Sequence, residues 1–301
     1  MARCEVCFRH CDIREGQLGF CGARTCRDGV VCAANYGRIT SLALDPIEKK
    51  PLRRFHAGTR ILSVGSYGCN LRCPFCQNAE ISWSAQAFSY AEEALGTACA
   101  GEAASAGQIE QLSAQALANA AGFYKQQGNI GVAFTYNEPL IGYEFVRDTA
   151  KLVKEAGMVN VLVTNGTAEL SVLEELSPYI DAMNIDLKGF SDSYYSDVLG
   201  GNREMVMAFI ERAAQLCHIE LTTLIIPGEN DTEKEMRAIS AFIAGLQDAD
   251  GRIIGEDIPL HISRFFPCFH MTDRPATDVR HIYRLTEVAG EYLRYVYTGN
   301  C

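Results

Sequence analysis

The sequence lacks several features that define common classes of protein. It has no apolar run long enough to cross a bilayer, and its N-terminus, Met1-Ala2-Arg3-Cys4, lacks the apolar core of a signal peptide. Basic residues are scarce, with 27 against 37 acidic residues, and the net charge of -10 disfavours nucleic acid as a partner. Tryptophan occurs once, at Trp83, where a packing role is expected. These absences predict a cytoplasmic protein that does not bind membranes, and they disfavour nucleic acid as a partner, with a local basic groove as the alternative.

Cysteine, by contrast, is abundant. Nine of the 13 cysteines precede Gln77, in a chain of 301 residues that is 48% apolar. In a small secreted chain such a count would suggest disulfides, whereas in a cytoplasmic enzyme clustered cysteines more often bind metal or act in catalysis. The sequence therefore predicts two metal sites, in one large α/β domain with a small appendage.

Three cysteines are spaced C-x3-C-x2-C between Gly68 and Asn78, at Cys69, Cys73 and Cys76. Iron–sulfur clusters are normally held by four cysteines, so a loop with three leaves one iron of a four-iron cluster open to another ligand. The alternative is zinc with a fourth ligand from elsewhere, although zinc sites favour paired C-x2-C motifs. The spacing favours a [4Fe-4S] cluster with one open iron.

This loop, with Asn78 two residues after its last cysteine, resembles that of the radical S-adenosylmethionine (SAM) superfamily, in particular the branch of the pyruvate formate-lyase activating enzymes. The runs 16–22 and 44–52 are similar to the radical protein of the AmmeMemoRadiSam system. The resemblance implies that Cys69, Cys73 and Cys76 bind the cluster and that Phe75 and Asn78 lie against SAM. Reductive cleavage of SAM would give a 5'-deoxyadenosyl radical, with the electron supplied by a donor such as flavodoxin or ferredoxin.

A second metal site is predicted in the N-terminal segment, residues 1–58. Its first four cysteines are Cys4, Cys7, Cys11 and Cys21, and the surrounding arginines and glycines cannot form an apolar core. Structural zinc and a second iron–sulfur cluster fit the four thiolates equally well, and thiols that merely pack are the third interpretation. Further potential ligands nearby are Cys26, Cys32 and His10. Residues 31–44 of this segment are expected to form a hairpin around Tyr36.

Residues 59–301 alternate between strand and helix patterns, which predicts a parallel sheet. A strand at 60–66 precedes the cysteine loop, and residues 82–107 form an excursion over the barrel mouth. The expected strands that follow are 130–135, 159–164, 182–186, 219–226 and 260–265, with an edge strand at 295–297, and the expected helices are 108–125, 138–156, 168–176, 204–216, 233–246 and 278–292. The fold class is therefore α/β, and about six units fit the partial (β/α)6 barrel of the activating-enzyme branch.

Polar residues follow the predicted strands at the edge where such barrels carry their active sites. The resemblance implies that Glu138 holds the amino group of SAM, that Asp186 and Lys188 contact its ribose and carboxylate, and that Ile226 lies beside the adenine. Asn165 belongs to a Thr-Asn-Gly run like that of the activating enzymes. Two simpler interpretations stay open: Glu138 starts a helix, and Asp186 with Lys188 forms a structural ion pair.

Other residues near these strand ends carry weaker predictions. Val163 replaces an aspartate that helps to bind a monovalent cation in some relatives, so no such cation is expected. Either His261 or Arg264 should face the barrel mouth, since alternation puts them on opposite faces. Lys49 and Lys50 are expected on a solvated surface, with a reach to a carboxylate near the cluster as the alternative.

Three functions are compatible with these observations. The first is a glycyl-radical activating enzyme that acts on a protein partner. The second is a radical SAM enzyme that modifies a small molecule or protein within a complex of Memo-type and AMMECR-type proteins. The third is a metal-binding scaffold without catalysis.

Overall fold

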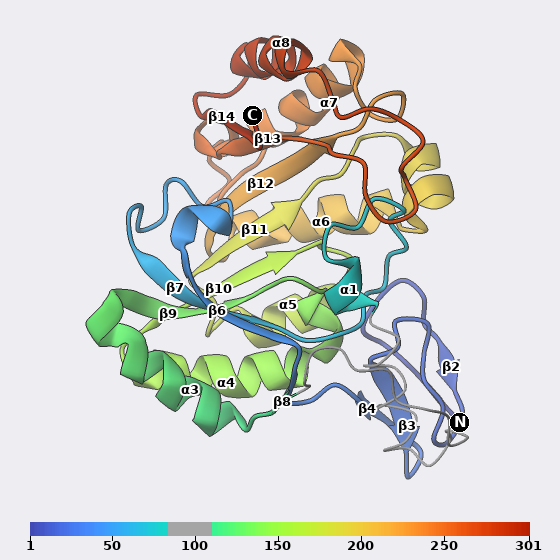
Figure 1. The fold of residues 1–301 in the computed structure, drawn as a ribbon, viewed down its shortest axis with the longest axis vertical. Coiled ribbons are helices and arrows are strands. Elements are labelled where there is room, and N and C mark those ends of the chain that lie inside the picture. Colours follow the sequence, from blue (N-terminus) through green and yellow to red (C-terminus); the bar gives the residue numbers. More distant parts are fainter. Residues whose placement is uncertain (84–109) are drawn as a thin grey trace.

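The computed structural model describes residues 1–83 and 110–301 of the chain. Its main sheet has eight strands in the order β14-β13-β12-β11-β10-β9-β7-β6 (Figure 1). Every neighbouring pair is parallel except β6 and β7. The strands are Ser41–Pro46 (β6), Arg60–Gly65 (β7), Asn129–Phe134 (β9), Val159–Thr164 (β10), Ala182–Asp186 (β11), His218–Ile225 (β12), Leu260–Arg264 (β13) and Val296–Gly299 (β14).

Helices cover the outer face of this sheet (Figure 1). They are Ala114–Phe123 (α3), Tyr143–Glu155 (α4), Leu170–Leu176 (α5), Arg203–Ala214 (α6), Glu233–Ala244 (α7) and Val279–Gly290 (α8). The short helix Ala79–Ser82 (α1) lies instead beside the N-terminal unit (Figure 1). Their apolar residues recur every three or four positions; in α4 the buried positions include Phe145, Val146 and Val153. Side chains of Ser, Asn, Thr or Asp cap the N-termini of α3, α6, α7 and α8.

The predicted α/β class is confirmed, and the strand and helix order matches the prediction. Six helical crossovers connect the parallel strands from β7 to β14, and β14 occupies the edge expected for residues 295–297. Because β6 and β14 have no strand between them in the described sheet, the barrel is partial. The predicted helix 138–156 begins with a 3-10 turn, Pro139–Gly142 (η3). Other short turns are Ile47–Lys49 (η1), Tyr124–Gln127 (η2), Tyr194–Leu199 (η4, a π-helix) and Gly255–Asp257 (η5).

The predicted hairpin around Tyr36 is wrong. Val30–Ala33 (β4) pairs instead with Arg24–Arg27 (β3), while Arg38–Ile39 (β5) pairs with Glu110–Gln111 (β8). The turn between β3 and β4 is Asp28-Gly29, where both residues have positive φ, 52° and 75°. Two left-handed residues in this position match the twist of antiparallel strands, which explains why the chain reverses here.

The segment 1–58 contributes to two parts of the fold. Ala2–Arg3 (β1) pairs with Asp12–Ile13 (β2), and with β3 and β4 they form a small unit beside the barrel (Figure 1). Strand β6, in contrast, belongs to the main sheet, so this sheet begins before residue 59. The predicted excursion 82–107 falls largely outside the described residues. Within the described ranges, none of the helices combines the length and apolar character that a bilayer crossing requires.

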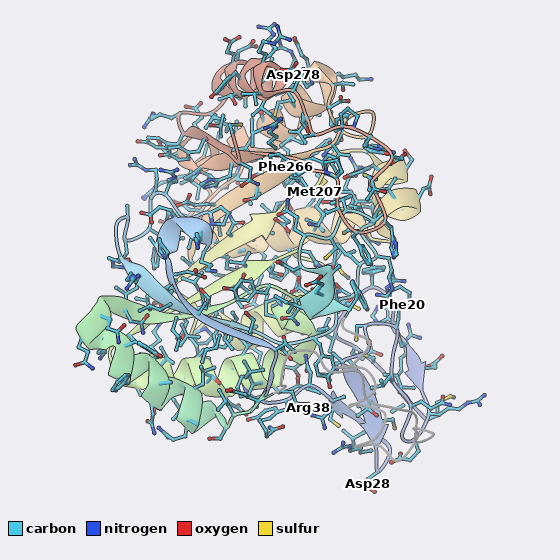
Figure 2. All side chains as sticks on the ribbon, viewed as in Figure 1. Phe20, Asp28, Arg38, Met207, Phe266 and Asp278 are labelled. Carbon is cyan, nitrogen blue, oxygen red and sulfur yellow. The ribbon has the colours of Figure 1, made fainter. Side chains whose placement is uncertain are left out.

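The small N-terminal unit is held against the barrel by polar contacts. The Arg9 side chain donates a hydrogen bond of 2.8 Å to the carbonyl of Asn70, and Arg72 donates one of 2.6 Å to the carbonyl of Phe20. The Phe20 ring lies at this junction (Figure 2), with the guanidinium groups of Arg9 and Arg72 at 3.3 Å and 3.8 Å from its centre. Arginine over an aromatic face is a favourable arrangement, so both arginines join the two units.

Candidate active site

A large cavity opens at the carboxyl ends of the parallel strands. Each of the seven parallel strands contributes to its wall, either from the strand itself or from the residues that follow it, as expected for the active site of a (β/α) barrel. The wall includes Lys50, Cys69, Cys73, Phe75, Cys76, Asn78, Tyr136, Glu138, Asn165, Asp186, Lys188 and His261.

The cysteine loop leaves the end of β7 and places Cys69, Cys73 and Cys76 together in the cavity wall. The loop begins at Gly68, whose φ of +91° suits glycine alone. A Cβ at this position would lie 2.7 Å from the Cys21 carbonyl oxygen and 2.7 Å from the Ala23 Cβ. The loop therefore depends on close contact with the N-terminal unit.

Two polar hydrogens point to the Cys69 sulfur. The backbone N–H of Leu71 lies 3.5 Å from Sγ, and the side-chain amide of Asn165 lies 3.6 Å from it. Burial raises the pKa of the Cys69 thiol well above its usual value and that of Cys73 to about 11. Thiolates at these positions therefore require a metal or a comparable positive charge. Three thiols on one loop, with two N–H donors to the sulfur of Cys69, fit an iron–sulfur cluster.

Glu138 ties the ends of two neighbouring strands together at the cavity. Its Oε1 accepts hydrogen bonds from the Leu140 N–H at 3.0 Å and the Thr164 hydroxyl at 2.7 Å, and its Oε2 accepts one from the Asn165 N–H at 2.8 Å. Burial raises its pKa to about 7, despite these donors. Both interpretations of Glu138 agree with the structure: it caps η3, and it lines the cavity with acceptor capacity left on Oε2.

Tyr136, just after β9, has a left-handed backbone with φ of 73°, which is rare for a bulky residue and is found mainly where the surroundings enforce it. Its hydroxyl donates a 2.8 Å hydrogen bond to Asp45. Asn137 accepts from the Ser66 N–H and donates to the Gly68 carbonyl. The glycine-like conformation is therefore preserved by side-chain bonds.

Asp186 and Lys188 form an ion pair of 2.8 Å at the cavity wall. Asn184, two residues before Asp186, faces the same cavity, as strand alternation predicts. Burial alone lowers the pKa of Lys188, but the negative charges of Asp186 and Cys73 outweigh it and raise that pKa well above its usual value. The pair therefore stays charged, and it lies beside the cysteine loop.

Of the other predicted cofactor contacts, Phe75, Asn78 and Asn165 line the cavity, whereas Ile226 does not. Ile226 is fully buried in the core. The cavity face of β12 carries Thr222 and Leu224, but the strand ends at Ile225 and the next N–H bonds to the Asn230 side chain. The chain thus turns before Ile226 can continue that face, and a contact between Ile226 and adenine is not supported.

Lys50 was expected on a solvated surface, and the structure corrects this. Its side chain is 3% exposed, lies 2.9 Å from Asp45 and sits 4.6 Å from the centre of the Tyr136 ring. Although burial alone would raise the pKa of Asp45, hydrogen bonds from Lys50 and Tyr136 lower it. Lys49 remains exposed. The sequence signal for this ion pair is the presence of opposite charges five residues apart, at Asp45 and Lys50, on either side of the short turn η1.

His261, rather than Arg264, faces the cavity. Its Nε2 lies 2.6 Å from Glu220 Oε2, whereas Arg264 donates to the Thr277 carbonyl. Glu220 is fully buried and also accepts from His218 and from the N–H groups of Arg53 and Arg54. Burial opposes its ionisation, but these donors lower the pKa of Glu220 to about 2. Glu220, which sequence reasoning missed, thus fixes the imidazole at the wall.

The four N-terminal cysteines, Cys4, Cys7, Cys11 and Cys21, line a second, smaller cavity between the N-terminal unit and the barrel. The other potential ligands lie elsewhere: Cys26 and Cys32 lie outside this cavity wall, and His10 pairs with Glu5 and Glu169. Over residues 1–83 and 110–301, no three His, Cys, Asp or Glu side chains meet at the position of a single ion. This holds for the loop of Cys69 as well as for the N-terminal group.

The fold and the site define a class of protein: an α/β partial barrel that carries a cluster-binding cysteine loop at the carboxyl ends of its strands. Residues 63–238 match the Radical SAM superfamily, and the chain belongs to that superfamily. Membership implies a [4Fe-4S] cluster and SAM as cofactors, and the residues of the large cavity fit both. When bound, these cofactors supply an organic radical generated by one-electron reduction.

Known proteins are similar to this chain over different lengths. It is 37% identical to the uncharacterized protein MJ0808 of Methanocaldococcus jannaschii over 300 residues. This aligned region covers 99% of this chain and 81% of that protein. The chain is 24% identical to the pyruvate formate-lyase-activating enzyme of Clostridium pasteurianum over 186 residues. This aligned region covers 61% of this chain and 69% of that enzyme. The SAM-bound structure of Streptococcus suis SuiB has the same fold, with a TM-score of 0.55 and 14% identity over 80% of this chain and 52% of SuiB.

Proposed function

We propose that the protein uses SAM and its loop cluster to abstract a hydrogen atom from a protein partner, in the manner of an activating enzyme. The observation that carries this proposal is the grouping of Cys69, Cys73 and Cys76 with Glu138 and the Asp186–Lys188 pair around one cavity. Glu138 offers an acceptor for an ammonium group, and the ion pair offers both a donor and an acceptor for hydroxyl and carboxylate groups.

The open sheet supports a large substrate. Its two edges, β6 and β14, have no described strand between them, and the last residues of the chain, Asn300 and Cys301, contribute to the cavity wall. A partial barrel of this kind leaves a lateral approach to the strand ends. By its name, the Clostridium pasteurianum relative activates another enzyme, and that relationship supports the proposal of a protein substrate for this chain.

A second candidate is modification of a small molecule within a complex of Memo-type and AMMECR-type proteins. The similarity to MJ0808 covers 99% of this chain, whereas the similarity to the activating enzyme covers 61%. The runs 16–22 and 44–52, which resemble the AmmeMemoRadiSam protein, contain Cys21 of the N-terminal cavity and Lys50 of the active-site wall, whose partner is Asp45.

Anaerobic reconstitution with iron, sulfide and a strong reductant tests the shared chemistry. The wild type should convert SAM to 5'-deoxyadenosine and methionine, as measured by liquid chromatography. Cys73→Ala should abolish both products, while Cys217→Ala, outside both cavity walls, serves as the matched control. Cleavage that persists in Cys73→Ala would refute the assignment of the loop.

The substrate is tested separately. Purified glycyl-radical proteins, and Memo-type and AMMECR-type proteins, would each be added to the reduced enzyme with SAM. A doublet in the electron paramagnetic resonance spectrum of a glycyl-radical partner supports the activating-enzyme proposal. Cleavage stimulated only by the Memo-type or AMMECR-type proteins would replace it with the second candidate.

A further inference from the structure

Four thiols from one short segment surround the smaller cavity. Cys4, Cys7 and Cys21 are buried, with exposed fractions of 4%, 7% and 6%, and Cys11 completes the set. The backbone holds this arrangement, because the Cys4 N–H donates to the Cys11 carbonyl at 2.9 Å, directly beside the β1–β2 pairing. The apolar part of the remaining wall comes from Val6, Ile13 and Ile141 on the two units. The four thiols thus share one small cavity.

The same cavity carries positive charge and an unused hydrogen-bond donor. Arg9 and Arg24 both contribute to its wall. Arg24 is 4% exposed and pairs with Glu144 at 2.6 Å through one terminal nitrogen, but its buried Nε has no hydrogen-bond partner among the described residues. A buried donor without a partner costs about 1–3 kcal/mol, so it indicates a missing acceptor. Two guanidinium groups and a free N–H suit an anionic ligand rich in sulfur.

We propose that Cys4, Cys7, Cys11 and Cys21 hold a second [4Fe-4S] cluster, which passes single electrons to the cluster on the Cys69 loop. Four thiolates give full ligation of such a cluster, whereas the three of the loop leave one iron open. The net negative charge of a cluster with four thiolates matches Arg9 and Arg24, and bridging sulfides provide acceptors for the Arg24 Nε. This inference goes beyond the proposed function, which requires the loop cluster alone.

The position of the second site explains the choice of iron over zinc. The N–H of Cys69, a ligand of the loop cluster, donates to the carbonyl of Cys21, a ligand of the N-terminal site, at 3.3 Å. Arg9, in the wall of the N-terminal cavity, bonds to the carbonyl of Asn70 in the loop. One backbone hydrogen bond therefore links the two ligand sets. A redox-inactive zinc ion there would have only a structural role.

The electron balance of this role is simple. A one-electron carrier protein, such as a reduced flavodoxin or ferredoxin, donates one electron to the N-terminal cluster. The N-terminal cluster passes that electron to the loop cluster and returns to its oxidised form. The carrier is oxidised by one electron, and the loop cluster is reduced by one.

Metal analysis of the intact, anaerobically reconstituted protein tests the site without relying on activity. The wild type should contain about eight irons per chain and no zinc, since each cluster contributes four. A variant with Cys69, Cys73 and Cys76 all replaced by alanine should keep about four irons, with an electron paramagnetic resonance signal that SAM does not change. The double variant Cys7→Ser with Cys11→Ser should also keep about four, with a signal that SAM does change. Cys32→Ser is the matched control and should keep about eight.

Two neighbouring reduced clusters should also interact magnetically. The spectrum of the reduced wild type should be broader than the sum of the spectra of the two variants. Zinc in the triple-alanine variant, absence of any metal from it, or a simple sum of signals would overturn the proposal. A wild type that cleaves SAM with only about four irons would overturn this inference and leave the proposed function intact.

Discussion

The replacement Asp45→Asn tests whether the cluster of Asp45, Lys50 and Tyr136 is a charged, buried unit. Asp45 accepts hydrogen bonds from Lys50 at 2.9 Å and from Tyr136 at 2.8 Å, and the Lys50 side chain is 3% exposed. Asparagine keeps the size of the residue but removes its negative charge. Lys50 is then a buried ammonium group without a counter-ion. Removing one partner of a buried ion pair in this way destabilises the folded state by about 3–5 kcal/mol.

The destabilisation of the folded state by Asp45→Asn has an upper limit that depends on pH. A lysine of ordinary pKa 10.5 can escape the unfavourable state by losing its proton, which at pH 7 costs about 5 kcal/mol because each pH unit corresponds to about 1.4 kcal/mol. At pH 9 the same loss costs only about 2 kcal/mol. The destabilisation of Asp45→Asn should therefore be large at pH 7 and should shrink as the pH rises.

Thermal unfolding under anaerobic conditions measures this effect. At pH 7 the variant should melt on the order of 10 °C below the wild type, because about 1 kcal/mol corresponds to 2–4 °C in domains of comparable size. The double variant Asp45→Asn with Lys50→Met should recover most of the loss. Lys49→Met, which removes only an exposed partner of Asp45, is the control and should change stability by less than about 1 kcal/mol. A small loss at pH 7, or a loss that is the same at pH 9, would refute the reasoning.

Three further predictions concern the rest of the site. Asp186→Asn should weaken SAM binding at least about tenfold in equilibrium dialysis, because it removes the charged partner of Lys188 and the acceptor that we propose for the cofactor. Unchanged affinity would leave the pair purely structural. Glu220, with an ordinary pKa of 4.5 and a pKa of about 2 in the folded state, stabilises the fold fully above pH 4.5. That contribution, on the order of 3 kcal/mol, is lost as the pH falls towards 2, and acid unfolding of Glu220→Gln should lack this pH dependence. Gly68→Ala should destabilise the protein by about 1–3 kcal/mol in chemical unfolding, since its φ and the nearby Cys21 carbonyl both exclude a side chain; a neutral result would show that the loop can shift.

The fold and the cluster loop could be predicted because their signals are local. Strands and helices alternate with clear apolar patterns, and the three loop cysteines lie within eight residues of each other. The strand-end residues Glu138, Asp186 and Lys188 were found for a similar reason. They are polar residues at the end of buried strands, where a core would not select them.

The structure departs from the sequence-based expectations where distant residues determine the outcome. The burial of Lys50 depends on Tyr136 and Asp45, which approach it only when β6 pairs with β7 beside β9. Ile226 has the right spacing for the cavity face, but the bond between its N–H and Asn230 turns the chain. The hairpin predicted around Tyr36 forms instead around Asp28-Gly29, a dipeptide that strongly favours a two-residue hairpin turn.

The contact between Gly68 and Cys21 has a consequence for attempts to divide or recombine the chain. A shortened protein that starts at residue 59 would lose the carbonyl to which the Cys69 amide bonds, as well as the arginine side chain that bonds to Asn70. Such a barrel would be left with a malformed loop, even though every loop cysteine is still present. Chimeras of related proteins should therefore succeed only when the amino-terminal piece and the loop come from the same parent.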